Sequence, residues 1–214
     1  MTVRWDWITG HGDEIWLRTQ EHLLLTALPV LLGLAIAFPL ALLVIRWRWI
    51  EGTLLGLAGV LFTIPSIALF LLLGPFTGIL TRTTALIGLT LYTLLILLRN
   101  IVEGLRGVPA DVVESAEAMG YRRVARLLAV ELPLALPVIM AGLRIATVTT
   151  VGLVTITAVI GQGGYGRFFI DGFQRQFATA TIVGVVLSVA LAIGADLVLL
   201  TIQRAVTPWT RRAA

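Results

Sequence analysis

The chain has 214 residues, of which 58% are hydrophobic and 13% are charged, with a net charge of +4 and a mean hydropathy of +0.97. Soluble domains carry charge on about a quarter of their residues, so this composition indicates an integral membrane protein. The chain has no Cys, and all sixteen basic residues are Arg. These absences exclude disulfides, a thiolate nucleophile, a Schiff-base lysine and the P-loop lysine, so any ATP hydrolysis must belong to another polypeptide.

Residues 1–22 contain four acidic residues but no basic, apolar leader of signal-peptide type. We therefore expect this stretch to be retained as an interfacial segment outside the membrane. His11 and His22 are the only histidines, and their spacing from the nearby acids fits no standard ligand motif. We expect no metal site here.

Five apolar segments follow, at residues 23–45, 53–73, 83–98, 134–160 and 178–203. Crossing about 30 Å of hydrocarbon takes roughly 20 helical residues, so each segment is a candidate membrane span. The third segment is short, and the length of the fourth favours a tilted helix. The sequence therefore predicts an all-α, polytopic membrane protein with five transmembrane helices.

The second segment contains the break Thr63-Ile64-Pro65-Ser66. Proline removes a backbone hydrogen bond, and the flanking hydroxyls place polar groups at the same depth as the freed carbonyls. We predict that Thr63, Pro65 and Ser66 line a translocation path. Proline alone is ordinary in membrane helices, so Pro29 and Pro39 in the first segment receive no such role.

Orientation follows from the Arg residues, because positively charged loops stay in the cytoplasm. An external N-terminus leaves five Arg outside, one in the fourth span and ten inside. The ten inside are Arg46, Arg48, Arg99, Arg106, Arg122, Arg123, Arg126, Arg204, Arg211 and Arg212. Membrane topology therefore accounts for the isoelectric point near 10.6, and we expect no nucleic-acid partner.

Residues 100–133 form a polar loop between the third and fourth spans, on the side predicted to be cytoplasmic. We expect two short helices joined by a sharp bend. Asp111 can cap the first helix, and Glu114 adds negative charge to its opening turn. Gly120 supplies a left-handed residue on which that helix stops, and Pro133 marks the start of the next long helix.

The same loop carries the pattern Glu-x-Ala, three residues, Gly, nine residues, aliphatic, x, Leu-Pro, beginning at Glu114. This pattern is similar to the cytoplasmic EAA loop of ABC importer permeases, whose helix docks in a cleft of the ATPase subunit. Ser115 replaces the middle Ala, and Val130 replaces the usual Ile. An accidental match on an amphipathic surface helix is the alternative. The resemblance implies these ATPase-coupling residues: Asp111, Glu114, Ser115, Ala116, Met119, Gly120, Arg122, Arg123 and Pro133.

Further segments along most of the chain resemble permeases of osmoprotectant importers. They are Glu21–Leu23, Thr63–Ser66, Leu98–Asn100, Val130–Arg144 and Thr207-Pro208, together with a glycine-rich turn. The resemblance implies the type I permease fold and uptake of glycine betaine, carnitine, choline or proline-type solutes. It also implies a separate ATPase that binds ATP and Mg²⁺, an extracytoplasmic binding protein, and a second permease that is either an identical copy or a sister chain.

The glycine-rich turn, Gly161–Gly166, formally fits G-x-G-x-x-G. It follows a membrane span and opens no strand-turn-helix unit, so it fails as a dinucleotide site. The resemblance places it on the outer face, beneath the binding protein, whereas a solvated loop is the default interpretation of its charges. The implied docking residues are Gly161, Gly163, Gly164, Tyr165, Gly166 and Arg167.

Arg144 and Asp196 are the two ionisable residues well inside apolar segments, at comparable depth. A charge at mid-membrane is costly and usually finds a partner. We expect the two to pair, within one chain or across a dimer, unless each extends separately to the interface. Asp196 also keeps open an ion-coupled secondary transporter as an alternative function, beside an ABC importer permease for another small solute such as an amino acid.

Overall fold

The computed structural model describes residues 3–78 and 80–209, and every regular element within these ranges is helical. The all-α prediction is confirmed. The main helices are α1 (Trp5–Gly10), α2 (Gly12–Arg46), α3 (Glu51–Thr63), α4 (Ser66–Thr77), α5 (Arg82–Arg106), α6 (Ala110–Ala118), α7 (Arg123–Arg126), α8 (Leu132–Ile156), α9 (Gly166–Gln174) and α10 (Ala178–Val206). Short turns of other helix types are η1 (Arg48–Ile50), η2 (Leu127–Glu131) and η3 (Thr157–Ile160).

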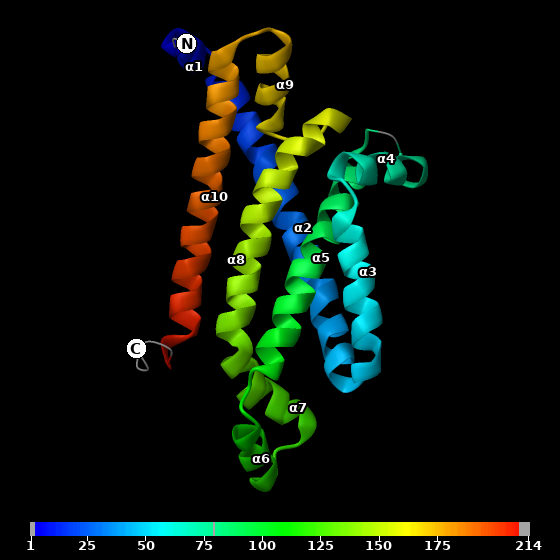
Figure 1. Ribbon diagram of the computed structural model, residues 1–214. Helices are drawn as coiled ribbons and strands as arrows, with labels where there is room; N and C mark the ends of the chain where they lie inside the picture. Colours follow the sequence, from blue (N-terminus) through cyan, green and yellow to red (C-terminus); the bar gives the residue numbers. More distant parts are fainter. Residues whose placement is uncertain (1–2, 79, 210–214) are drawn as a thin grey trace.

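The molecule is elongated, and its two ends differ (Figure 1). The N-terminal helix α1, helix α9 and the bent helix α4 lie at one end. Helices α6 and α7 project from the other end, towards which α10 also runs. The N-terminus and the α6–α7 segment are therefore on opposite sides of the long helices.

Four helical runs are long and apolar enough to cross a membrane: Gly12–Arg46, Arg82–Arg106, Arg123–Ile160 and Ala178–Val206. The run Arg82–Arg106 contains the predicted span 83–98 and is longer than that prediction. Residues 12–22, predicted as part of a separate interfacial segment, continue helix α2 without a break. Acidic and polar residues there end the hydrophobic pattern but do not end the helix.

The second predicted span, 53–73, is not a straight crossing. Its two halves, Arg48–Thr63 and Ser66–Thr77, are bent by 103°. Ile64 is extended at φ −66° and ψ 126°, because a residue that precedes proline avoids the helical region. Helix α3 alone has 13 residues, or about 20 Å, which is shorter than the hydrocarbon layer. The described residues therefore contain four helices long and apolar enough to cross a membrane, or up to five candidate crossings if the bent pair counts as one.

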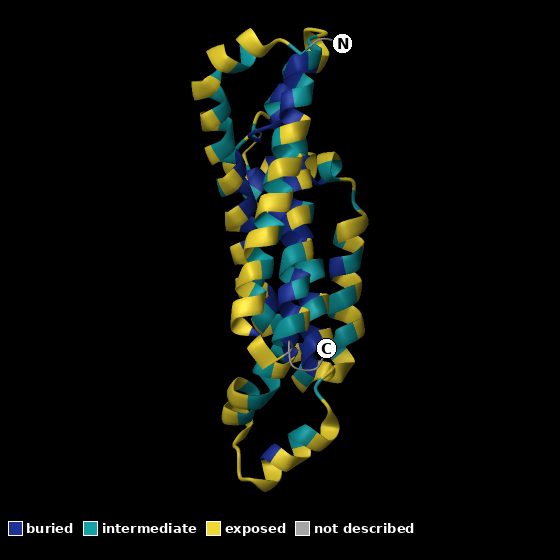
Figure 2. Ribbon diagram, turned by 90° about the vertical axis from the view of Figure 1, so that its left-hand side faces the viewer, coloured by how far each residue is buried: buried dark blue, intermediate teal, exposed yellow. Residues whose placement is uncertain are grey.

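The centre of the bundle is formed by α2, α5 and α8, whose buried apolar residues make one continuous core. Small residues let these helices approach closely, as is usual in membranes. A Cβ on Gly142 of α8 would lie 2.3 Å from Cβ of Asn100 on α5, and one on Gly104 would lie 3.0 Å from the carbonyl oxygen of Ala135. Helix α10 packs on α8 and α9, and its outward face stays exposed (Figure 2).

Helices α7 and α8 are parts of one helical run, Arg123–Ile160, which has 38 residues and a length of about 57 Å. We call this run the rod. Pro133 lies in the first turn of α8, where the sequence predicted a helix start, but this start is not a break in the chain's helical path. The π-helical turn η2 leads directly into α8. Such a wide turn lets a helix pass a residue that has no N–H to donate.

Candidate functional site

The polar loop folds into an elbow, which we define as residues 110–126 and which contains α6 and α7. Helix α6 begins at Ala110, with Pro109 at its N-cap position. Asp111 therefore lies inside the first turn and makes no capping hydrogen bond, so its predicted capping role is wrong. Glu114 lies beyond the first turn, because the helix starts earlier than predicted. Asp111 remains the acidic residue of that turn, where its negative charge interacts favourably with the helix dipole.

Gly120 ends helix α6 in the left-handed conformation, with φ +84°. This prediction is confirmed. The Gly120 N–H donates to the carbonyl of Glu117 at 2.9 Å, and the Tyr121 N–H donates to Ala116 at 3.1 Å. A Cβ at Gly120 would meet nothing within 4 Å. The requirement for glycine here is therefore set by the backbone angle rather than by space.

A single arginine ties the two arms of the elbow together. Arg126 Nε lies 2.5 Å from Glu131 Oε1, and Arg126 Nη1 also pairs with Glu117 of α6. Arg122 and Arg123, the predicted coupling residues, are exposed, and neither forms an ion pair within the described ranges. The role of Arg126 was missed because its partners lie nine and five residues away: the bend brings Glu117 to it, and the π-helical turn brings Glu131 to it.

The surface of the elbow carries large apolar side chains that no other part of the described chain covers. Met119 is 71% exposed and Val124 is 67% exposed. Tyr121 and Leu128 are also exposed, whereas Ala116 is buried against the elbow itself. An apolar patch on a segment that projects beyond the membrane spans marks a protein contact site. The predicted residues Glu114 and Ser115 lie exposed on the same helix, and Pro133 lies half-buried at the start of α8.

The break in the second span places Thr63, Pro65 and Ser66 at one corner. Thr63 and Pro65 are exposed and Ser66 is half-buried, but the Thr63 hydroxyl donates to the Val60 carbonyl at 2.7 Å. The carbonyl of Ile64, freed by the break, accepts a hydrogen bond from the Tyr92 hydroxyl of α5. Tyr92 was missed, because a backbone carbonyl as partner leaves no mark in the sequence.

Arg144 and Asp196 meet within one chain and join α8 to α10. Arg144 Nε lies 2.8 Å from Asp196 Oδ1, and Arg144 Nη2 lies 2.8 Å from Oδ2, which is the strong bidentate geometry. Gln203, not singled out in the sequence, extends this contact. Its Oε1 accepts from Arg144 at 3.4 Å, and its Nε2 donates to the Pro137 carbonyl at 3.2 Å.

The glycine-rich turn is folded inward. Gly163, Gly164, Tyr165 and Gly166 are buried, whereas Gly161 is exposed and Arg167 is half-buried. The four buried residues pack on α2 and on the end of the rod, so they cannot themselves touch a docked protein. Four of the six residues in the predicted docking set are thus covered within the chain. Only the exposed edge of the turn, with Gly161 and Arg167, is left to contact a partner.

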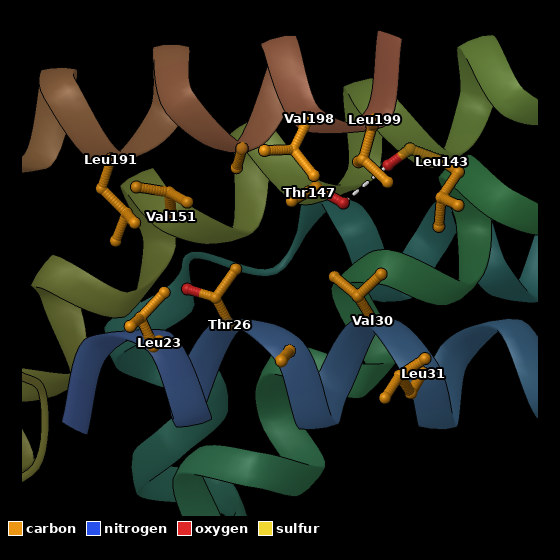
Figure 3. Close-up of a pocket in the computed structure, with 12 residues that line it drawn as sticks. Leu23, Thr26, Val30, Leu31, Leu143, Thr147, Val151, Leu191, Val198 and Leu199 are labelled. Carbon is orange, nitrogen blue, oxygen red and sulfur yellow. Dashed lines mark hydrogen bonds between the residues drawn. The ribbon is translucent and has the colours of Figure 1, made fainter. Parts of the chain in front are cut away.

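A cavity of about 280 Å³ lies between α2, α8 and α10 (Figure 3). Thr26 and Thr147 supply its only polar side chains among twelve lining residues. The Thr147 hydroxyl already donates a hydrogen bond to the Leu143 carbonyl at 2.8 Å. An apolar wall of this kind cannot replace the hydration of a charged group. Within the described residues, no group of three His, Asp or Glu side chains could hold a metal ion.

Long apolar helices, a broken span and a projecting elbow with exposed apolar side chains indicate a protein that is embedded in a membrane and extends beyond it. The family of binding-protein-dependent transport system inner membrane components matches residues 26–212, and the chain belongs to this family. It is the permease component of an ABC importer, and ATP hydrolysis falls to a separate component of that importer.

The chain is similar to permeases from several bacteria. The choline transport system permease protein OpuBB of Bacillus subtilis is 35% identical over 198 residues, which cover 92% of this chain and 91% of that protein. The osmoprotectant import permease protein OsmW of Salmonella typhimurium is 39% identical over 197 residues, covering 89% and 90%. A chain of the methionine ABC transporter MetNI in an inward-facing conformation has a TM-score of 0.79 at 25% identity, and the match covers 97% of this chain and all of that one.

Proposed function

We propose that this permease imports osmoprotectants of the glycine betaine, carnitine, choline and proline class. The observation that carries the proposal is the similarity to OpuBB and OsmW, which extends over about nine-tenths of each chain rather than over the coupling loop alone. The inclusion of proline is supported only by the resemblance of the sequence motifs. Since Asp196 is held by Arg144, the chain's intramembrane acid is not free to carry a coupling ion, which disfavours an ion-driven mechanism.

In the proposed topology the bent α3–α4 pair counts as one crossing, which gives five crossings with the N-terminus outside. The opposite placement of the N-terminus and the elbow supports this, as does the number of Arg near the elbow (Figure 1). One chain supplies half of a pathway, so a second permease, identical or a sister chain, completes it. Large apolar side chains exposed on the spans, such as Phe76 at 87% and Leu71 at 61%, would face that partner or lipid.

The elbow is the proposed contact with the ATPase. Met119, Tyr121 and Val124 offer an apolar surface to a cleft, and the ion pairs of Arg126 keep the two arms of the elbow together. When ATP closes the ATPase dimer, the elbow moves as a unit. Because α7 continues into α8, this displacement is applied directly to a helix that spans the membrane. The spans then reopen towards the outside, where the binding protein delivers its cargo.

The test is reconstitution of the permease with its cognate ATPase and binding protein in liposomes that contain ATP. Uptake of radiolabelled choline, glycine betaine, carnitine and proline is compared with uptake of methionine and histidine. We expect ATP-dependent uptake of at least one of the first four solutes. Uptake of methionine or histidine, with no uptake of the other four solutes, would show that the proposed cargo is wrong. Uptake driven by a proton or sodium gradient without ATP would overturn the mechanism.

A further inference from the structure

His22 of α2 is fully buried, and both nitrogens of its ring are used. Nε2 lies 3.0 Å from the carbonyl oxygen of Val151 in α8. Nδ1 lies 3.3 Å from the backbone nitrogen of Tyr165 in the glycine-rich turn. A carbonyl can only accept and a backbone N–H can only donate, so the partners require a neutral imidazole with its hydrogen on Nε2.

The turn packs tightly around the same histidine. Gly164 has φ +36°, and a Cβ on it would lie 2.6 Å from Cβ of His22 and 2.7 Å from the carbonyl oxygen of Arg18. The Tyr165 ring lies with its centroid 4.6 Å from that of His22, and its hydroxyl donates to Thr19 at 3.0 Å. The backbone of Gly164 and the ring and hydroxyl of Tyr165 therefore all contact α2.

These contacts join α2 to two segments that are far from it in the sequence. Val151 belongs to the rod, Tyr165 to the turn and His22 to α2, with separations of 129 and 143 residues along the chain. A carbonyl of its own helix could accept from the N–H of a histidine ring, as the Trp7 carbonyl lies 2.8 Å from His11 Nδ1, but it could not donate to the second nitrogen. Here each ring nitrogen connects α2 to a different segment. Removal of the ring would break one hydrogen bond between α2 and the turn and one between α2 and the rod, and would leave the hydrogen bond of the Tyr165 hydroxyl in place.

We infer that His22 is a positioning residue for energy coupling, which locks the glycine-rich turn to the outer end of the rod. The elbow begins the same rod at the inner end. A protein that contacts the turn outside and a protein that contacts the elbow inside then both act on the rod as one rigid body. This inference rests on the proposed function, in which a binding protein touches the outer end and an ATPase touches the inner end.

The experiment uses the reconstituted complex with three variants, His22→Phe, His22→Asn and His22→Gln. Phe keeps a planar ring but has no nitrogen. Asn places an acceptor near the position of Nδ1 and loses the Val151 bond, whereas Gln reaches the position of Nε2 and loses the Tyr165 bond. His11→Gln is the matched control, because His11 is the other histidine of the chain and lies outside this contact.

Two quantities are measured: hydrogen exchange of the backbone amides in residues 161–167, and the ratio of binding-protein-stimulated to basal ATPase activity. We expect roughly two- to tenfold faster exchange in His22→Phe and His22→Gln, as loss of one hydrogen bond implies, and near-native exchange in His22→Asn. The stimulation ratio should fall towards one in all three variants and stay unchanged in His11→Gln. A purely structural role would lower the yield of the complex without lowering this ratio.

Native exchange and native stimulation in His22→Phe would overturn the inference. So would a wild-type Tyr165 amide that exchanges as fast as a free loop, a measurement that needs no variant to fold. If the wild-type complex shows no uptake and no stimulation, the proposed function fails instead. The two failures are thus distinguishable.

Discussion

Gly120 and Gly164 both adopt positive φ, at the two ends of the molecule, but for different physical reasons. At the elbow, φ is +84° and a Cβ would meet open space. At the outer turn, φ is only +36°, and a Cβ would lie 2.6 Å from His22. Glycine thus serves backbone geometry at the inner end and close packing at the outer end. The inner end keeps its surface free for a partner, whereas the outer end is fixed by contacts within the chain.

The largest effect is expected from Gly164→Ala. Overpacking costs about 1–3 kcal/mol, and a left-handed residue with a Cβ adds about 1–2 kcal/mol. We expect a lower unfolding temperature and less folded protein, measured by thermal unfolding of the purified permease. Gly161→Ala is the matched control, since Gly161 has φ +77° with nothing within 4 Å and should show the backbone term alone. Equal stability of the two variants would remove the distinction between packing and backbone geometry at this end.

The Arg144–Asp196 pair tests whether contacts within the chain stabilise the middle of the rod, as they do the glycine-rich turn, or whether the middle depends on them as little as the exposed elbow does. Asp196→Asn or Arg144→Gln leaves one charge without its partner inside the membrane, so each should weaken the attachment of α10 to α8 and reduce the folded yield. The measurement is the monodisperse fraction after solubilisation. The double swap, Arg144→Asp with Asp196→Arg, should recover part of that yield. A swapped protein no better than either single variant would show that the contact contributes no specific stability.

At the elbow we expect the opposite result: a substitution should reduce transport and leave the protein folded. In Gly120→Val, a β-branched side chain disfavours φ +84° by about 1–2 kcal/mol and changes the direction of α7 relative to α6. ATP-dependent uptake should fall sharply, whereas membrane insertion should persist and the unfolding temperature should fall only by the few degrees that this backbone cost implies for a chain of this size. Gly12→Val, at a helical glycine with open space, is the control. Normal uptake by Gly120→Val at normal expression would contradict the coupling role of the elbow.

Local chemistry explains which features the sequence predicts. Hydrophobic stretches predict the spans, the Pro65 break predicts the bend, and Gly120 predicts a left-handed helix end, because each depends on a few neighbouring residues. The depth of Arg144 and Asp196 in their segments made pairing an expectation, although the apolar pattern does not indicate the rotation of each helix that brings the two together. These features cover the helical architecture and most of the elbow.

The remaining contacts depend on partners distant in the chain, often backbone atoms. His22 bonds a carbonyl 129 residues away, and Tyr92 bonds the carbonyl of Ile64. No side-chain pattern marks such acceptors, so His22 could only be described as an interfacial histidine. The continuous rod was missed for a related reason. Proline usually marks a helix start, and the π turn that carries the helix past Pro133 has no simple sequence signature.

The smallest expected effect is that of Tyr165→Phe, which removes one hydroxyl from the outer turn and keeps the ring against His22. The Tyr165 hydroxyl donates to Thr19 at 3.0 Å, and a neutral hydrogen bond of this kind contributes about 0.5–1.5 kcal/mol. For a chain of this size we expect the unfolding temperature to fall by about 1–6 °C. Tyr121→Phe is the control, because Tyr121 lies exposed on the elbow and should leave stability unchanged. If both substitutions shifted the unfolding temperature equally, the outer turn would be no more tightly packed than the elbow. If Tyr165→Phe alone lowered it, then even a single hydroxyl at this end would stabilise the fold, whereas the corresponding hydroxyl at the other end is free to meet a partner.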